Sequence, residues 1–472
     1  MRGKPSCARG VNATVHCSEL LRRSHMLILL RKYSAKRNCG LPAEYLLWYA
    51  QSNKCFGIYG TDICEDEIKP IMRSQTTDME STSQGRTPSF WLLLSINACY
   101  YMTTALYGPF LVVYYEQHGV SSTLIGILST IGCLAMILVQ PLWSKLSDRC
   151  GRARTFAALM ALGSAATLQF YYLGTGIAAF IFAAAALAIF QSSVAPMIDA
   201  ICVRGAAAQG RNFASIRIGG TIGYSLVVLV AALIMNRHPF WQFAFGGVGY
   251  LILSGLILLL PSGEDHQPVP RNKKKSLFTR LSLREIFDTD EVIYVLIFAF
   301  LMQLGNSFAM SFLGVFVVQI GGGNLQMGML NFISALAEIP VLLSIRRFMR
   351  PGNALRFIGT AAALLGLKVV IMSTGTMPAM VIAMLFQGIT YMVIHIGAAT
   401  YVSAHALPGR ASEAQGLIYL VQGGFASIIG NVCGGILIDA AGIHTAYLLT
   451  GSIVLLGAAL TASTMKLRYR SA

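Results

Sequence analysis

The chain has 472 residues, of which 55% are hydrophobic and 12% are charged. Soluble domains carry about 25% charged residues, so this composition excludes an ordinary water-soluble protein. The formal net charge of +16 could suit a nucleic-acid partner, but the positions of the basic residues argue against one.

Long stretches without Asp, Glu, Lys or Arg indicate the class of fold. One covers 44 residues from Thr155 to Ile198, and another covers 46 residues from Val292 to Ala337. One membrane crossing needs about 20 apolar residues, so each stretch can cross twice. Glycines near positions 175 and 322 favour the turns between the crossings. Lipid cannot pair free backbone polar groups, and a barrel would show short alternating strands, so we expect helices.

The whole chain predicts an all-α membrane protein with twelve transmembrane helices in two pseudo-symmetric six-helix bundles. A faint repeat supports two equivalent halves, because glycine pairs lie at 219–220 in the fifth span and at 423–424 in the eleventh. The spans are expected at residues 89–114, 123–143, 154–173, 176–202, 215–236, 241–261, 290–319, 326–345, 353–373, 378–402, 414–437 and 443–465. The bundles then occupy 89–261 and 290–465, with a cytoplasmic linker at 262–289 and a cytoplasmic tail at 466–472.

Residues 1–88 form a polar N-terminal extension with 13 Lys or Arg and 8 Asp or Glu. Their best apolar run, at 26–30, is too short to cross a membrane, and no secretory signal pattern is present. We expect a disordered segment, which is either a regulatory tail or an over-extended reading frame, since Met72 and Met79 shortly precede the first span.

The basic residues are distributed unevenly between the loops. With the N-terminus inside, the inward loops, their flanking helix ends and the tail hold 21 Lys or Arg, whereas the outward loops hold only Arg237. This pattern follows the positive-inside rule and predicts a multi-pass protein of the plasma (inner) membrane with both termini cytoplasmic. We therefore expect the lipid bilayer, and not a nucleic acid, as the partner of this chain. The ten cysteines lack metal-ligand spacing, so we expect no disulfide and no metal site.

Five ionisable residues remain inside the spans once the loops and span ends are set aside. A central Asp or Lys costs roughly 2.5 to 3.5 kcal/mol on insertion scales, so such residues usually face a water-filled cavity or a partner. An inert interhelical pair is the alternative interpretation. The five residues are Asp199, Arg217, Glu338, Lys368 and His395.

Asp199 and Arg217 each lie nine residues from position 208, in the turn between the fourth and fifth spans, so we expect them at equal depth. Arg217, Thr221 and Tyr224 follow at i, i+4 and i+7 and share one helix face. This stripe suits a polar solute with a ring. Alternatively, Arg217 extends to the inner lipid headgroups.

Glu338 and His395 are also expected to share a depth in the second half. Burial disfavours the charged form of a carboxyl group, whereas a nearby Lys368 or protonated His395 favours it. We therefore predict that Glu338 exchanges the coupling proton, together with His395, Lys368 and Asp199. The alternative is a Glu338 to Lys368 ion pair without functional titration.

Several uncharged polar residues inside the spans could bind the solute. They lie about one or two helical turns from each other or from Asp199, and polar amides equally often hold membrane helices together. The candidates are Gln191, Ser192, Gln303 and Asn306.

The segment LWSKLSDRCGRAR at 142–154 resembles the signature between the second and third helices of the major facilitator superfamily. Ser144 replaces its usual leading glycine. The resemblance implies a cytoplasmic gate whose aspartate exchanges charge contacts as the two halves rock. The gate residues would be Asp148, Arg149, Gly151, Arg152 and Arg154.

The segments APMIDA, SIRIGGTIGY and AEIP, at 195–200, 215–224 and 337–340, resemble the branch of lactose permease-like, nucleoside and phenylpropionate proton symporters. This resemblance implies a buried pair of Asp199 and Arg217. It also implies a solute-stacking ring at Tyr224 and a proton site at Glu338 and His395. The GPxxGG-like pattern of drug antiporters is absent from the fifth span, which disfavours export.

These features predict a secondary active transporter that imports a small polar organic solute with a proton by alternating access. The solute would be a sugar, a nucleoside or an aromatic acid, the proton would be the coupling ion, and we expect no other cofactor and a monomer. A phosphate-binding loop and enzyme motifs are absent, so an enzyme is not expected. The alternatives are a proton-coupled exporter and a transporter-like sensor that moves no solute.

Overall fold

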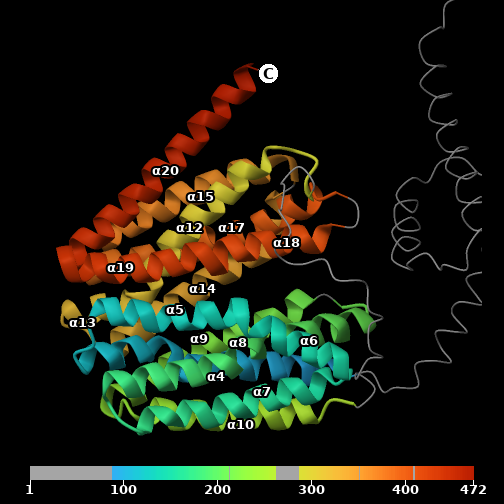
Figure 1. The fold of residues 1–472 in the computed structure, drawn as a ribbon, viewed down its shortest axis with the longest axis vertical. Helices are drawn as coiled ribbons and strands as arrows, with labels where there is room; N and C mark the ends of the chain where they lie inside the picture. The colour runs from blue at the N-terminus through green and yellow to red at the C-terminus, as the bar shows by residue number, and fades with distance from the viewer. Residues whose placement is uncertain (1–87, 212, 262–285, 350, 408–409, 472) are drawn as a thin grey trace, which may run out of the picture. The chain divides into compact units, whose positions relative to one another are not determined.

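The computed structural model describes residues 88–211, 213–261, 286–349, 351–407 and 410–471 (Figure 1). Helices dominate these residues, and their only β-structure is an isolated bridge between Phe287 and Ala406. The expected N-terminal extension, up to residue 87, and most of the linker lie outside the described residues.

The first six predicted spans all form helices, coloured blue to green in Figure 1. The second span is split at Val139, just before Pro141, whose ring cannot continue a helix ladder. The third span ends in a short 3-10 helix, Gln169–Tyr172. The α-helices are α4 (Phe90–Gln117), α5 (Ser122–Leu138), α6 (Gln140–Cys150), α7 (Ala153–Leu168), α8 (Ile177–Ala208), α9 (Phe213–Arg237) and α10 (Trp241–Leu258).

The last six predicted spans form a second group of helices, yellow to red in Figure 1. Within the eleventh span lies a π-helical segment, η3 (Leu420–Ala426). The α-helices are α12 (Val292–Ser311), α13 (Leu313–Gln319), α14 (Asn324–Phe348), α15 (Pro351–Met372), α16 (Met377–Leu385), α17 (Gln387–Ala404), α18 (Ala411–Tyr419), α19 (Ser427–Ala441) and α20 (Ile443–Ser471). We call α4 to α10 the N-terminal bundle and α12 to α20 the C-terminal bundle.

Ten stretches of helix among the described residues are long and apolar enough to cross a membrane. The other two predicted spans are α4 and α7, which are also helical. Large apolar side chains are exposed along the outer faces, for example Leu226, Val230 and Leu233 on α9, as expected for helices that contact lipid. The prediction of an all-α membrane protein is confirmed.

Glycines let helices of the two bundles approach to backbone contact. A Cβ atom added at Gly126 on α5 would overlap the carbonyl oxygen of Asn431 on α19. One added at Gly435 on α19 would lie 2.5 Å from the carbonyl oxygen of Ser122. Larger residues at these positions would therefore push α5 and α19 apart.

The two glycine pairs of the faint repeat make different contacts. Gly220 packs against α4 within the N-terminal bundle, whereas Gly423 packs against Met136 on α5, across the bundle interface. The sequence repeat therefore does not mark equivalent packing in the two halves.

The end of the bundles that carries Asp439, here called the Asp439 end, is closed by polar contacts. The Asp439 carboxylate on α19 accepts hydrogen bonds from the backbone N–H groups of Ser122 at 3.1 Å and Thr123 at 2.8 Å. These N–H groups belong to the first turn of α5, where a helix has unpaired donors and partial positive charge. Asn324 adds a bond of 2.8 Å to the Met235 carbonyl oxygen. The C-terminal bundle thus caps a helix of its partner bundle.

We predict that Asp439→Ala opens the Asp439 end, because α5 loses a charge-assisted cap from the other bundle. The distance between spin labels at Ser121 and Ala440, both exposed positions, reports the opening by pulsed electron resonance. A longer-distance population should appear in Asp439→Ala and remain small in Asp439→Asn, which keeps one acceptor oxygen.

Glu413→Ala is the matched control, since Glu413 lies on the same span and pairs with Arg410 of its own helix at 3.3 Å. Identical distance distributions in Asp439→Ala and Glu413→Ala would show that the cap does not hold this end.

Candidate functional site

Two side chains of opposite charge lie on helices of different bundles that pack against each other. Arg217 lies on α9 of the N-terminal bundle, and its guanidinium carbon is 4.2 Å from the centre of the Tyr101 ring on α4. Glu338 lies on α14 of the C-terminal bundle and interacts electrostatically with Arg217. Both side chains are half-buried, so neither charge is directed fully into lipid.

Asp199 and Arg217 do not form the ion pair that the resemblance implied. Asp199 on α8 accepts a hydrogen bond of 3.3 Å from the Asn97 side-chain amide, and no described residue forms an ion pair with either group. The reason is the position of α4, which packs against both α8 and α9. Asn97 and Tyr101, one turn apart on α4, each take one member of the expected pair.

Gly220 is the residue that lets α4 approach α9 closely enough for these contacts. An added Cβ would lie 2.5 Å from the Tyr101 ring and 2.6 Å from the Asn97 side-chain oxygen. The glycines of the segment SIRIGGTIGY therefore determine where the partners of Arg217 and Asp199 lie.

Tyr224 and Asn331 form a hydrogen bond between the two bundles, about two helical turns from Arg217 and Glu338. The Tyr224 hydroxyl donates a hydrogen bond of 3.4 Å to the Asn331 side-chain oxygen. Tyr224 is seven residues after Arg217 on α9, and Asn331 is seven residues before Glu338 on α14. The helices α9 and α14 run antiparallel, so equal spacing along the two chains keeps the residues paired. Tyr224 with Asn331 forms one layer of the site, and Arg217 with Glu338 forms the next.

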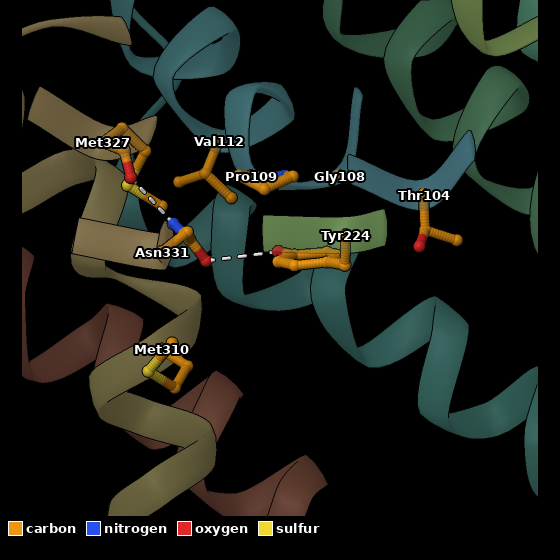
Figure 2. Close-up of a pocket in the computed structure, with 8 residues that line it drawn as sticks. All are labelled: Thr104, Gly108, Pro109, Val112, Tyr224, Met310, Met327 and Asn331. Atoms are coloured by element: carbon orange, nitrogen blue, oxygen red, sulfur yellow. Dashed lines mark hydrogen bonds between the residues drawn. The ribbon is translucent and has the colours of Figure 1, made fainter. Parts of the chain in front are cut away.

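A cavity of about 270 Å³ borders the Tyr224 to Asn331 layer. Figure 2 shows residues from α4, α9, α12 and α14 around it, so both bundles contribute to its wall. Its lining consists of Thr104, Gly108, Pro109, Val112, Tyr224, Met310, Met327 and Asn331. Of the predicted solute-binding residues, only Tyr224 lines it.

Lys368 is completely buried in the C-terminal bundle. Its ammonium group donates to the side-chain oxygen of Gln387, whose amide donates in turn to Asn306 at 3.1 Å. Lys368 interacts electrostatically with Glu338 but forms no ion pair with it. The alternative of a direct Glu338 to Lys368 bridge is therefore not formed, and Gln387, which the sequence did not single out, is the partner of Lys368.

Other predicted polar residues mainly bond to neighbouring helices or their own helix. Gln303 donates to Ser427 at 3.0 Å, and Gln191 donates to the buried Tyr107 hydroxyl at 2.6 Å. The Thr221 hydroxyl bonds to the carbonyl of its own helix at Arg217. The Ser192 hydroxyl is buried without a partner among the described residues. For Gln191 and Gln303, these contacts fit the alternative in which polar side chains hold helices together.

His395 belongs to α17, but its side chain is outside the part of the structure that is described. Its expected role beside Glu338 therefore stays a prediction.

The predicted gate segment forms the junction of α6 and α7. Gly151 ends α6 with φ 63°, a left-handed conformation that favours glycine, and Arg154 donates to the Leu260 carbonyl at 2.6 Å. Asp148, Arg149 and Arg152 are exposed at this junction. We call this end of the bundles the Asp148 end.

Comparison of the sequence with protein families identifies the family of this chain. Residues 91–449 match the model of the family described as MFS_1 like. The chain belongs to the MFS_1 like family. The predicted membership of the major facilitator superfamily is confirmed.

Relatives of this MFS_1 like protein are transporters. The uncharacterized transporter YwbF of Bacillus subtilis (strain 168) is 24% identical over 355 residues, which cover 74% of this chain and 86% of YwbF. The maltose permease of Geobacillus stearothermophilus is 24% identical over 260 residues, which cover 54% of this chain and 63% of the permease.

The solved structure of the nucleoside transporter NupG is similar in fold, with a TM-score of 0.66 at 18% identity. The match covers 79% of this chain and 99% of NupG. Family and relatives together show that the MFS_1 like protein is a multi-pass membrane transporter and not an enzyme.

We predict that Gly220→Ala impairs transport and lowers stability by about 1 to 3 kcal/mol, the usual cost of overpacking. The new methyl group would displace Tyr101 and Asn97, and with them Arg217 and Asp199. Thermal unfolding of the purified protein and solute uptake measure the two effects.

Gly255→Ala is the matched control, since an added Cβ there meets no atom within 4 Å. It should leave uptake intact and keep or raise the melting temperature, because alanine favours helix more than glycine does. Equal behaviour of the two variants would contradict the close contact at Gly220.

Proposed function

We propose that this protein imports a small organic solute together with a proton by alternating access. The observation that carries the proposal is the placement of Arg217 and Glu338 on opposite bundles, on helices that pack against each other, with an electrostatic interaction between them. Opposite charges on two moving bodies couple their movement to the charge state of either group.

Glu338 is the group that we assign to the coupling proton. In its ionised form it attracts Arg217 and so favours approach of α9 and α14. In its protonated form this attraction is lost, and Arg217 becomes available to a solute. Lys368 and Asp199 would change the electrostatic potential around this pair. Lys368 interacts electrostatically with Glu338, and Tyr100 interacts with both Asp199 and Arg217.

The contacts at the Asp439 end relate this structure to one state of the proposed cycle. Under the positive-inside rule the Asp439 end lies outside and both termini lie in the cytoplasm of the plasma membrane. The structure then corresponds to a state closed to the outside, from which a solute would leave inward. Asp148 and the basic residues near it would close the opposite end in the other half of the cycle.

Proton-coupled export is the second candidate. It is favoured by similarity to the multidrug resistance protein MdtG of Escherichia coli (strain K12 / DH10B), 24% identical over 286 residues that cover 58% of this chain and 69% of MdtG. The absence of the antiporter glycine-proline pattern from α9 argues for import. Uptake by right-side-out and inside-out vesicles distinguishes the two directions.

The test is a proteoliposome uptake screen across sugars, nucleosides and aromatic acids, each with and without an imposed pH gradient. An inward proton gradient of one pH unit stores about 1.4 kcal/mol per proton, enough for about tenfold accumulation at one proton per solute. Import predicts accumulation that rises with the gradient. A protein that binds solutes without moving any would instead be a sensor.

We predict that Glu338→Gln keeps solute exchange between the two sides but loses accumulation driven by the proton gradient, so that the concentration ratio falls to about one. The amide preserves the size of the side chain but cannot exchange the proton. Counterflow and gradient-driven uptake, measured in the same proteoliposomes, separate these activities.

Glu413→Gln serves as the control, because Glu413 is exposed and pairs within its own helix. It should accumulate solute like the unmodified protein. Undiminished accumulation by Glu338→Gln would exclude Glu338 as the proton site.

A further inference from the structure

The cavity and the charged layer follow one another along α9 and α14 and have opposite chemical character. We propose that the solute is an amphipathic organic anion with an aromatic end, which occupies the cavity while its carboxylate reaches Arg217. This inference rests on the proposed function for the movement of the solute, and it specifies the class of the solute.

The cavity offers an apolar surface suited to a ring. Met310, Met327, Val112 and Pro109 present carbon and sulfur atoms to it, and the Tyr224 to Asn331 hydrogen bond forms a polar edge (Figure 2). Thioether groups make favourable contacts with aromatic rings. A sugar carries more hydroxyl groups than Thr104, Tyr224 and Asn331 can bond, so part of its hydration would be lost without replacement.

The volume indicates that the cavity holds only one end of the solute. It measures about 270 Å³, which is below the range of about 300 to 1,000 Å³ typical for pockets of drug-sized ligands. Glycine-mediated contact closes the interface on its far side, where Gly314 packs on Val112 and Gly328 packs on Ala232. The rest of the solute must therefore extend toward the charged layer.

The distance between the two layers sets the length of the solute. Seven residues separate Tyr224 from Arg217 and Asn331 from Glu338. At a rise of 1.5 Å per residue, the layers are about 10 Å apart. A ring in the cavity and a carboxylate at Arg217 match this spacing when a short chain connects them.

The charge of the solute follows from the partners of Arg217. Its guanidinium stacks on Tyr101 and forms no ion pair with a described residue, so its N–H donors can bind a carboxylate in the bidentate geometry that Arg favours. Asp199 accepts a hydrogen bond from Asn97 and forms no ion pair with Arg217 among the described residues.

Glu338 is then the internal competitor of the solute for Arg217. One proton taken up by Glu338 releases Arg217 for one anion, so that proton and anion enter together without net charge. The other titratable groups around this pair are Tyr100 on α4, Tyr224 on α9, Tyr391 on α17 and Lys368 on α15. None of the tyrosines supplies a second cation.

The test measures binding to the purified full-length protein in lipid nanodiscs by calorimetry. The ligands are 4-phenylbutyrate, butyrate and 4-phenylbutan-1-ol, with uridine and maltose as members of the competing classes. We expect 4-phenylbutyrate to bind at least tenfold more tightly than butyrate, which lacks the ring, and than the alcohol, which lacks the charge.

Two variants separate the ends of the site. Gly108→Leu places a side chain in the cavity at a position where an added Cβ meets no atom within 4 Å, and it should abolish the tenfold gain from the ring. Arg217→Gln should abolish the preference for the acid over the alcohol. Gly255→Leu, equally open but outside the cavity, should change neither preference, and melting curves confirm that each variant is folded.

The outcomes decide between the inference and the proposed function. Tighter binding of uridine or maltose than of 4-phenylbutyrate, equal effects of Gly108→Leu and Gly255→Leu, or no binding of any ligand would overturn the inference. Gradient-driven uptake of uridine or maltose would keep proton-coupled import while rejecting the anion. Binding of 4-phenylbutyrate as expected, without accumulation by a proton gradient, would keep the solute class and reject proton coupling.

Discussion

The cost of an ionised side chain in hydrocarbon is the constraint on which the site depends. Arg217 and Glu338 lie within apolar helices, where each charge needs a partner, an aromatic face or water. The fold meets this need by placing the two residues on different bundles and directing them toward one interface. In the proposed transport cycle, where the bundles move against each other, the same charges would also couple movement to protonation.

Small residues allow the close helix contacts within and between the bundles. Gly220 brings α4 against α9, and α4 in turn separates Asp199 from Arg217. Gly126 and Gly435 bring α5 and α19 into contact, where Asp439 can reach the first turn of α5. The glycines thus act through distance, since each removes a side chain that would otherwise hold two helices apart. The same contacts leave the cavity beside Tyr224 and Asn331 between the bundles.

The candidate site was predictable in part. The five ionisable residues inside the spans could be found from the sequence, because an isolated charge in an apolar stretch is visible without any structure. Their partners could not be found in this way: Asn97, Tyr101 and Gln387 are polar or aromatic residues of ordinary appearance on helices distant in the chain. The Asp199 to Arg217 pair that the resemblance implied is not formed, because a third helix, α4, packs against both α8 and α9 and supplies other partners.

The sequence by itself determined that this protein is an all-α membrane protein with twelve helical segments, and it identified the superfamily by the segment at 142–154. These properties are local, since hydropathy and backbone hydrogen bonding are satisfied within each helix. Only the tertiary structure decided which charges meet, which amides bind one another and where a cavity remains. Those outcomes depend on the rotation and separation of neighbouring helices, which are determined by side-chain packing between segments that lie far apart in the chain.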